Sequence, residues 1–515
     1  MSKNLGKPQL SSRNTLRTSG DRATTSRAAN PPTITLTLAT PALLRDRRVV
    51  LSLVLLLGLI VRLWAMHWPP FPIDMNDWIA WGERIRDVGP RRFYAPGVFA
   101  DYAPGYIYVL WLTAIVKHTF FATSGADTYH ALYRLPPLLC DLGSTALIFL
   151  TVERAWNGRL ETDEGTTDAR GHNLLMPALA ALAFALNPAV IIDSAVWGQV
   201  DATFTFVLLL AVLLLPRKPE AAALSYVIAF LIKPQAFVLA PVFAIALIMR
   251  YPLIRVARIA VISVALAFII IFPFFGFRSF FELLNTINKS TNTYAYTSLF
   301  TYNLWGIYGF WKSDTVPLLG GLTLKTFGYL LYAAGLVYGV AEMVQQLRRK
   351  TEFLYTVFLF ASYFAFLPII VLTRMHERYL YPILPFLLIF AFLSLRKMTR
   401  HDTSDFAPRF LVLPLLIYAA VTMLHTMNLY QVYEYYSYYN TGGVPKSNDL
   451  FYNVYNNASV WCVLILLTFT TFVLCIPYWL PPWLPHFSLR LPRTDIVGDD
   501  EYQRVVPRVE ADGAS

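Results

Sequence analysis

The chain has 515 residues, of which 56% are hydrophobic and only 15% are charged, and its formal net charge is +11. A soluble protein of this size carries about a quarter charged residues, so the composition argues against a set of soluble domains. The Lys and Arg residues lie in short clusters between apolar runs, a pattern typical of membrane topology rather than of a nucleic-acid groove. We therefore expect no nucleic-acid partner.

Residues 1–48 form a polar segment before the first apolar run. The segment holds nine Lys and Arg residues against Asp21 and Asp46. It is too long and too polar to be an ordinary signal peptide. We expect a disordered basic tail on the cytoplasmic side of a membrane.

Apolar runs then recur from residue 49 to residue 477. Most have about 17–25 residues, enough to cross about 30 Å of hydrocarbon as a helix, and an isolated strand could not satisfy its backbone in lipid. The runs lie near 49–66, 104–121, 135–153, 174–190, 200–216, 219–232, 235–250, 255–275, 327–346, 353–372, 378–395, 409–427 and 459–477. The sequence predicts an all-α polytopic membrane domain over 49–477 with about twelve transmembrane helices (10–13), followed by a C-terminal tail over 478–515.

Basic clusters predict which helix ends face the cytoplasm. The clusters lie at 217–218, 250–258, 348–350 and 396–400, and the segments expected outside are 67–103, 187–199, 276–315, 373–377 and 428–457. Three apolar runs separate 67–103 from 187–199, so only two of them can cross if both segments are outside. We expect 104–121 to be re-entrant or to lie along the interface.

The first outer segment carries acidic candidates for chemistry. Asp74 and Asp77 directly follow the first crossing and begin a predicted short amphipathic helix, 75–88. A carboxylate held partly out of water at the membrane surface is a better general base, whereas the alternative is that Asp74 only caps the helix. Asp101 and Tyr102 precede a Pro-Gly step, which fits an ordinary helix entry as well as a polar tip above the membrane.

A second polar group lies in 187–201, between two apolar runs, and includes Asp193, Gln199 and Asp201. Polar groups at that depth are expensive and need partners. A bound substrate or metal would supply such partners. Capping of the neighbouring helix ends is the alternative.

Cationic groups occur in two later segments. Lys233 precedes Pro234 at the outer turn of a predicted helical hairpin, where it either binds a phosphate oxyanion or extends to the interface. The short connection 374–378 holds two Arg, a His and a Glu, although an outer loop should be poor in Arg. It either binds an anion or forms structural salt bridges. Six tyrosines in 430–439 fit stacking on sugar rings or an interfacial belt.

In order and spacing these elements resemble the GT-C superfamily of membrane glycosyltransferases, in particular the glucosyltransferases and mannosyltransferases of asparagine-linked glycosylation and their bacterial relatives. The resemblance spans 50–395. Its motifs are Asp74 with Trp81 seven residues later, Asp101-Tyr102-Ala103-Pro104 for an Asp-Tyr-Pro-Pro element, Lys233-Pro234-Gln235 for a Lys-Gln step, and His376-Glu377-Arg378 for a His-Glu-Lys element. The stretch 187–201 is similar to the bacterial relatives.

This resemblance implies a GT-C-like helical bundle that transfers a hexose, glucose or mannose, from a polyprenyl-phosphate carrier with inversion, on the non-cytoplasmic face. Asp74 would be the catalytic base, and the cations would hold the departing phosphate. The acceptor would be a lipid-linked glycan, a lipid or a protein, in a prokaryotic plasma membrane or a eukaryotic endoplasmic reticulum. The candidate substrate-binding residues are Asp77, Asp101, Tyr102, Arg134, Asp193, Gln199, Asp201, Lys233, Gln235, Arg374, His376, Glu377 and Arg378.

We expect no cofactor, because a lipid-phosphate sugar is already activated and the sequence has no Gly-rich phosphate loop. A divalent metal at Asp193 and Asp201 is an open alternative, although their spacing is not diagnostic. A transporter or flippase of an anionic or lipid-linked solute is the main alternative function, and a catalytically silent assembly subunit is a third. The three cysteines lie in or near apolar runs, which argues against a disulfide framework.

Overall fold

The computed structural model describes residues 45–158, 174–400, 409–441 and 450–480. Contacts divide the chain into Met1–Ala42 and Leu43–Ser515, and the account below concerns the second unit. Most of the predicted tail 1–48 lies outside the described residues, as does most of the predicted tail 478–515.

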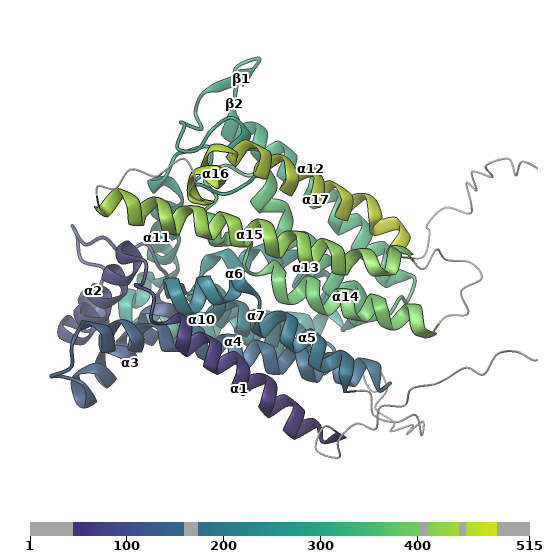
Figure 1. Ribbon diagram of the computed structural model, residues 1–515, viewed down its shortest axis with the longest axis horizontal. Helices are drawn as coiled ribbons and strands as arrows, with labels where there is room; N and C mark the ends of the chain where they lie inside the picture. The colour runs from purple at the N-terminus through teal and green to yellow at the C-terminus, as the bar shows by residue number, and fades with distance from the viewer. Residues whose placement is uncertain (1–44, 159–173, 401–408, 442–449, 481–515) are drawn as a thin grey trace, which may run out of the picture. The chain divides into compact units, whose positions relative to one another are not determined.

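The unit is built almost wholly of helices (Figure 1). The first half contains α1 Arg47–Ala65, α2 Pro72–Val88, α3 Pro104–Phe120, α4 Ala126–Trp156, α5 Leu175–Ala185, α6 Pro188–Ile191, η3 Ile192–Trp197, α7 Asp201–Leu214, α8 Pro219–Ile232, η4 Pro234–Leu239 and α9 Ala240–Arg250. The second half contains α10 Leu253–Phe275, α11 Ser279–Thr293, β1 Pro317–Leu319, β2 Leu322–Thr323, α12 Leu324–Arg348, α13 Phe353–Val371, η7 Glu377–Leu380, α14 Ile383–Arg400, α15 Arg409–Thr441, α16 Leu450–Asn456 and α17 Ala458–Trp479. Strands β1 and β2 pair as an antiparallel hairpin.

Eight of the described helical segments are long and apolar enough to cross a membrane, or nine if α5 and the α6–η3 segment count as one span bent by 47°. The eight are Arg47–Ala65, Ala126–Trp156, Leu253–Thr293, Leu324–Arg348, Phe353–Val371, Glu377–Met398, Phe410–Ser437 and Ala458–Trp479. Three further apolar helices, Asp201–Leu214, Pro219–Ile232 and Pro234–Arg250, are shorter, so eight or nine described segments meet the length on which the predicted count of about twelve was based. The predicted all-α polytopic fold is confirmed.

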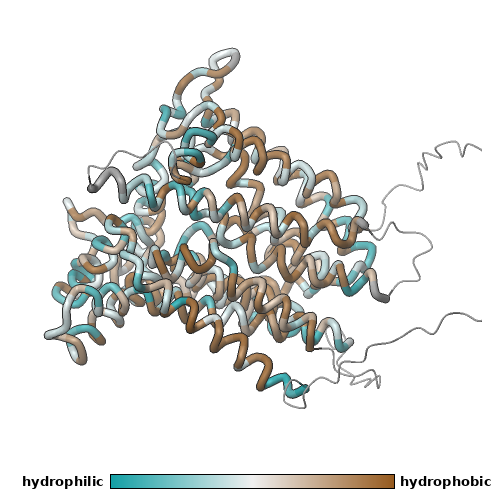
Figure 2. Tube along the Cα trace, in the orientation of Figure 1, coloured by the Kyte–Doolittle hydropathy of each residue, from teal (hydrophilic) through white to brown (hydrophobic). Residues whose placement is uncertain are grey.

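Helices α13 and α14 form the centre of the bundle. In the most apolar stretch of each helix, 94% of α13 and 83% of α14 is buried inside the protein. A helix that is apolar on all sides requires such a buried place. For α1 and α17 the buried share is only 28%. Figure 2 shows hydrophobic residues along these two outer helices, as expected for surfaces that face lipid.

Helix α15 corrects the predicted outer loop 428–457, because it continues to Thr441. Two of its tyrosines contact the segment that precedes α2. The Tyr433 hydroxyl donates to the Pro69 carbonyl at 2.7 Å, and the rings of Tyr436 and Phe71 meet edge to face at 5.1 Å. These tertiary contacts keep the segment helical beyond its apolar run.

Helix α3, predicted as the unusual run 104–121, lies beside α2 at one end of the helices, opposite the end at which α1 begins (Figure 1). Its last turn is tied to α2, because Lys117 Nζ and His118 Nε2 lie 2.5 Å and 2.7 Å from the Glu83 carboxylate. Among the described helices, α3 is not one of those long and apolar enough to cross. The expectation that 104–121 is re-entrant or lies along the interface stays a prediction.

Candidate active site

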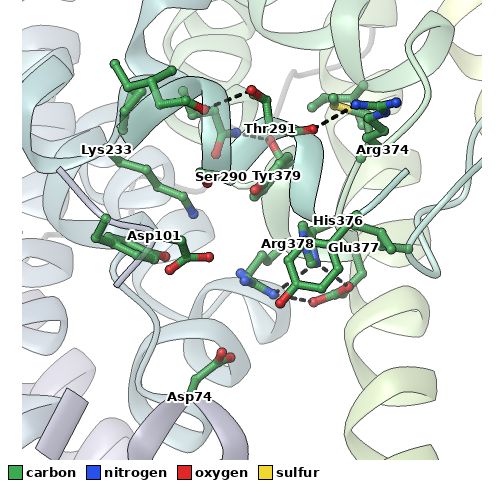
Figure 3. Close-up of a pocket in the computed structure, with 18 of the residues that line it drawn as sticks. Asp74, Asp101, Lys233, Ser290, Thr291, Arg374, His376, Glu377, Arg378 and Tyr379 are labelled. Atoms are coloured by element: carbon green, nitrogen blue, oxygen red, sulfur yellow. Dashed lines mark hydrogen bonds and ion pairs between the residues drawn. The ribbon is translucent and has the colours of Figure 1, made fainter. Parts of the chain in front are cut away.

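A cavity of about 670 Å³ lies between α2, η4, α11, α13 and α15. Ten of the fourteen residues singled out from the sequence line it, which are Asp74, Asp77, Asp101, Tyr102, Lys233, Gln235, Arg374, His376, Glu377 and Arg378. The fold thus gathers segments from 71 to 436 around one space. Figure 3 shows the Asp74, Asp101, Lys233 and Arg378 side chains pointing into it.

Helix α2 presents two carboxylates to this cavity. It begins with Pro72 at its first position, where the missing N–H costs nothing, so the predicted helix 75–88 is confirmed and starts slightly earlier. Its N-cap is Phe71, and Asp74 lies within the first turn; capping therefore does not explain Asp74. The buried face that orients Asp74 and Asp77 consists of Met75, Trp78, Trp81, Gly82 and Ile85.

The Asp74 carboxylate receives two hydrogen bonds from one short segment. Trp197 Nε1 donates to Asp74 Oδ2 at 2.7 Å, and the Gln199 side-chain amide donates to the same oxygen. Among the described residues, Asp74 Oδ1 has no hydrogen-bond partner. One oxygen is therefore held by the protein, and the other is open to the cavity.

The segment that holds Asp74 is a π-helical turn, η3, followed by Gly198. Gly198 has φ of +89°, a left-handed conformation that favours glycine, and a Cβ there would lie 2.9 Å from Arg134 Cγ and Met75 Cε. The backbone N–H groups of Gly198 and Gln199 donate to the Asp193 carbonyl at 3.1 Å and 2.9 Å. This tight turn aims both side-chain donors at α2.

Asp77 and Asp101 make this part of the cavity acidic. Burial, and next the negative charges of Asp74 and Asp101, raise the pKa of Asp77 to about 6. Burial also raises the pKa of Asp101, and the positive charges of Arg378 and Lys233 partly offset that rise. Partial desolvation therefore makes both carboxylates more basic than they are in water.

Aromatic rings form the floor beneath these carboxylates. The buried Tyr102 ring lies 5.0 Å from the Trp78 ring and 5.6 Å from the Trp81 ring, measured between centroids. Trp81 Nε1 donates to the Phe99 carbonyl at 2.9 Å. The floor is thus rigid and offers ring faces on which a sugar could stack.

Lys233 lies in the break between α8 and η4, at the position where the sequence predicted the turn of a helical hairpin. Pro234 follows it and cannot donate the hydrogen bond that would continue the helix. Lys233 Nζ lies 2.8 Å from both carboxylate oxygens of Asp201, and the two side chains are 7% and 0% exposed. Gln235 donates to the Tyr379 carbonyl at 2.8 Å. The lysine therefore has a buried counterion as well as its place on the cavity wall.

His376, Glu377 and Arg378 lie across the cavity from Asp74 (Figure 3). Arg378 Nη1 donates to Glu377 Oε1 at 2.9 Å and lies 3.5 Å from His376 Nδ1. Burial, and next the charge of Arg378, lower the pKa of His376, so at neutral pH it is a neutral hydrogen-bonding group and not a cation. Arg378 Nε is buried without a partner in the described part of the chain, so Arg378 retains donors for another acceptor.

Arg374, in contrast, is occupied by the protein. Its Nε and Nη2 donate to the buried Asp314 carboxylate at 2.6 Å and 3.2 Å, and its Nη1 donates to the Thr291 carbonyl and the Asn292 side chain at 3.0 Å and 2.8 Å. A guanidinium has five N–H donors, so one remains. Of the two uses predicted for the connection 374–378, anion binding or structural salt bridging, Arg374 has the second.

The other four candidates lie behind the cavity wall. Gln199 holds Asp74, and Asp201 holds Lys233. Arg134 donates to backbone carbonyls, namely those of Met66, Trp68, His130, Ala195 and Val196. Both Asp193 oxygens are buried without a partner in the described chain. Within the described ranges, no group of three or more His, Cys, Asp or Glu is placed to hold a metal.

A buried network behind the site was missed by the sequence reasoning. Asp141 accepts hydrogen bonds from Arg62, Ser194 and Tyr381. Arg62 and Asp141 are charges within predicted membrane crossings, which is itself a signal of function or specific pairing. That signal could have identified both residues.

No protein-family model matches the chain, and no curated protein matches it. Among solved structures, the chain is similar to ArnT from Cupriavidus metallidurans in the apo state, with 13% sequence identity and a TM-score of 0.41, over 83% of this chain and 77% of that one. A likeness this distant assigns neither a family nor an activity.

Proposed function

We propose that the protein is an inverting glycosyltransferase that moves a hexose, glucose or mannose, from a polyprenyl-phosphate carrier to a hydroxyl acceptor on the non-cytoplasmic face of the membrane. The observation that supports this most is the pairing of Asp74, with one unbonded oxygen, and Arg378, with unused donors, across one cavity. A base and an anion-binding group then face the same substrate.

In the proposed reaction, Asp74 Oδ1 accepts the proton of the acceptor hydroxyl while the hydroxyl oxygen attacks the anomeric carbon. A new carbon–oxygen bond forms, the bond between the anomeric carbon and the phosphate oxygen breaks, and the phosphate leaves with the bonding electron pair. Attack occurs opposite the leaving group, so the configuration inverts. Trp197 and Gln199 bind only Oδ2, which keeps Oδ1 available for the proton.

The departing phosphate gains charge and needs donors that are already in place. Arg378 would supply charge-assisted hydrogen bonds from its unused N–H groups. Lys233 would supply the N–H that Asp201 does not bind, and neutral His376 would supply a weaker hydrogen bond. Asp77 and Asp101 would accept from sugar hydroxyls.

The apolar part of the cavity suits the isoprenoid chain of such a carrier. Its walls come from α8, η4 and the membrane-length segments α10–α11, α12 and α13, and include Phe230, Phe237, Leu284, Ile287, Tyr332 and Ile369. Of these, Phe237 and Leu284 are 64% and 65% exposed. These exposed apolar side chains offer surface that an isoprenoid chain could contact.

The proposal is tested by giving the purified full chain labelled polyprenyl-phosphate glucose or mannose with a panel of glycolipid and lipid acceptors. We expect acceptor-dependent release of polyprenyl phosphate. Asp74→Asn is expected to lower kcat by about 10²–10⁴-fold, the contribution of a general base, with little change in donor affinity. Asp87→Asn, exposed on the same helix, is the matched control. A wild-type rate for Asp74→Asn would contradict the base assignment.

Sealed proteoliposomes separate this proposal from a transporter. If labelled lipid-linked sugar changes leaflets but no acceptor is ever glycosylated, the transporter alternative is correct and the transferase proposal is wrong.

A further inference from the structure

We propose that Asp141 is a positioning residue that holds the base side and the phosphate side of the cavity in register; this inference rests on the proposed function. Asp141 does not line the cavity. It contacts, instead, one residue of the segment that holds Asp74 and one residue of the segment that carries Arg378.

The contacts of Asp141 join four parts of the chain. Asp141 Oδ2 accepts from Arg62 Nε of α1 at 3.0 Å and from the Ser194 hydroxyl of η3, and Asp141 Oδ1 accepts from the Tyr381 hydroxyl, just after η7. The Arg62 and Asp141 side chains are both 0% exposed. Both oxygens of this buried carboxylate are hydrogen-bonded, although Arg62 Nη2 has no partner in the described part of the chain. A buried network of this kind favours one arrangement of the elements that it joins.

The base side is connected through η3. Ser194 lies one π-helical turn before Gln199, which donates to Asp74 with Trp197. Arg134 fixes the same turn by donating to the carbonyls of Ala195 and Val196 at 3.1 Å and 3.4 Å. The turn is therefore clamped from two sides, and a shift of Ser194 would move both donors to Asp74.

The phosphate side is connected through η7. The Tyr381 backbone N–H donates to the Arg378 carbonyl at 3.0 Å, so the two residues share one helical turn. The Tyr381 hydroxyl is bound to Asp141. Asp141 thus sets where the Arg378 backbone stands relative to η3, and a misplacement of about 1 Å can cost about 10²-fold in rate.

Two hydroxyl deletions test the role while leaving the Asp141–Arg62 ion pair in place. Ser194→Ala is expected to lower kcat by about 10–100-fold with donor KM unchanged, because it disturbs the base alone. Tyr381→Phe is expected to raise donor KM, because it disturbs the phosphate side. Since both hydroxyls meet at Asp141, the double variant should lose less than the product of the two single losses.

Matched controls delete hydroxyls that make no hydrogen bond to Asp141. Ser144→Ala removes a buried hydroxyl without a partner in the described chain, and Tyr363→Phe removes a hydroxyl that donates to the Gly335 carbonyl at 2.7 Å. Both are expected to retain wild-type kcat and donor KM. If Ser194→Ala and Tyr381→Phe act like these controls, or lower kcat with no split between the two parameters, the proposal is overturned.

Hydrogen exchange of the backbone over 192–200 gives a readout that needs no sugar transfer. We expect faster exchange there in Ser194→Ala than in Ser144→Ala. Equal exchange would overturn the positioning role. Faster exchange in a protein that never transfers sugar would contradict the proposed function and leave the structural link intact.

Discussion

Single residues of like chemistry have different uses in this site. Arg374 and Arg378 lie four positions apart in one short connection. Arg374 donates four hydrogen bonds to other protein groups, whereas Arg378 is bonded chiefly to Glu377. The two oxygens of Asp74 differ in the same way. What a residue can do for a substrate depends on which of its atoms the protein has already bonded.

The raised pKa of Asp77 leads to a prediction about stability. The pKa of Asp77 is about 6 in the folded protein, whereas its ordinary value, which applies to the unfolded chain, is 3.8. Its contribution to stability is therefore complete below the lower value and is lost as the pH rises through the higher one. We expect Asp77→Asn to raise the midpoint of thermal unfolding at pH 7. We also expect this variant to show a smaller decrease of the midpoint between pH 3.8 and pH 6 than the wild type.

The measurement is thermal unfolding of the solubilised protein, without substrate, over a series of pH values. Asp87→Asn serves again as the control on the same helix, because Asp87 is exposed and lies outside the cavity. An identical pH dependence in wild type and Asp77→Asn would show that Asp77 is not desolvated as described.

At the scale of elements, the cavity is assembled where regular helices are interrupted. The π-turn η3, the break at Lys233 and the connection before η7 each bring polar atoms to the same end of the bundle. Irregular backbone is tolerated at membrane depth when it is buried in protein or lines a cavity. These interruptions are therefore the places where the chemistry is expected.

Helix α11 depends on one arginine for its position. It supplies cavity residues such as Ile287, Ser290 and Thr291, yet it buries only Ser279 and Leu283. Its C-terminal end is bound by Arg374. Few buried contacts mean low local stability, so this bond has a large share in keeping α11 beside the cavity.

We expect Arg374→Ala to increase hydrogen exchange over 279–293. We also expect it to lower overall stability by about 3–5 kcal/mol, because Asp314 would be buried without its cation. Arg278→Ala is the control, since Arg278 is 71% exposed and pairs with Glu282 nearby. Unchanged exchange together with a raised donor KM would show instead that Arg374 binds substrate.

At the scale of the whole chain, orientation in the membrane decides which compartment the cavity faces. Exposed Lys289 lies on α11, beside the cavity, and exposed Arg348 ends α12 next to a basic cluster predicted to be cytoplasmic. In right-side-out vesicles, a membrane-impermeant maleimide is expected to label Lys289→Cys but not Arg348→Cys. The native cysteines are buried or half-buried, which keeps the background low. The reverse labelling would place the cavity in the cytoplasm.

The helices themselves could be predicted because long apolar runs have few other solutions in lipid. All thirteen predicted runs contain helix. The extension of α15 to Thr441 could not be predicted, because the polar and aromatic residues after 427 are helical through tertiary contacts such as Tyr433 to Pro69. Ten of the fourteen residues singled out from the sequence line the cavity. The sequence did not separate them from residues such as Gln199 and Asp201, which hold Asp74 and Lys233 from behind the cavity wall.

Composition and apolar spacing were sufficient to predict a helical membrane protein with polar groups gathered between its spans. The reason is that burial in lipid constrains every residue of a crossing alike. Only the tertiary structure decided the pairing of each charge. Asp201 with Lys233, Asp314 with Arg374 and Asp141 with Arg62 are joined across long stretches of chain. A buried charge requires a specific partner at hydrogen-bonding distance, and that partner is fixed by how the helices pack, not by the residues beside it in sequence.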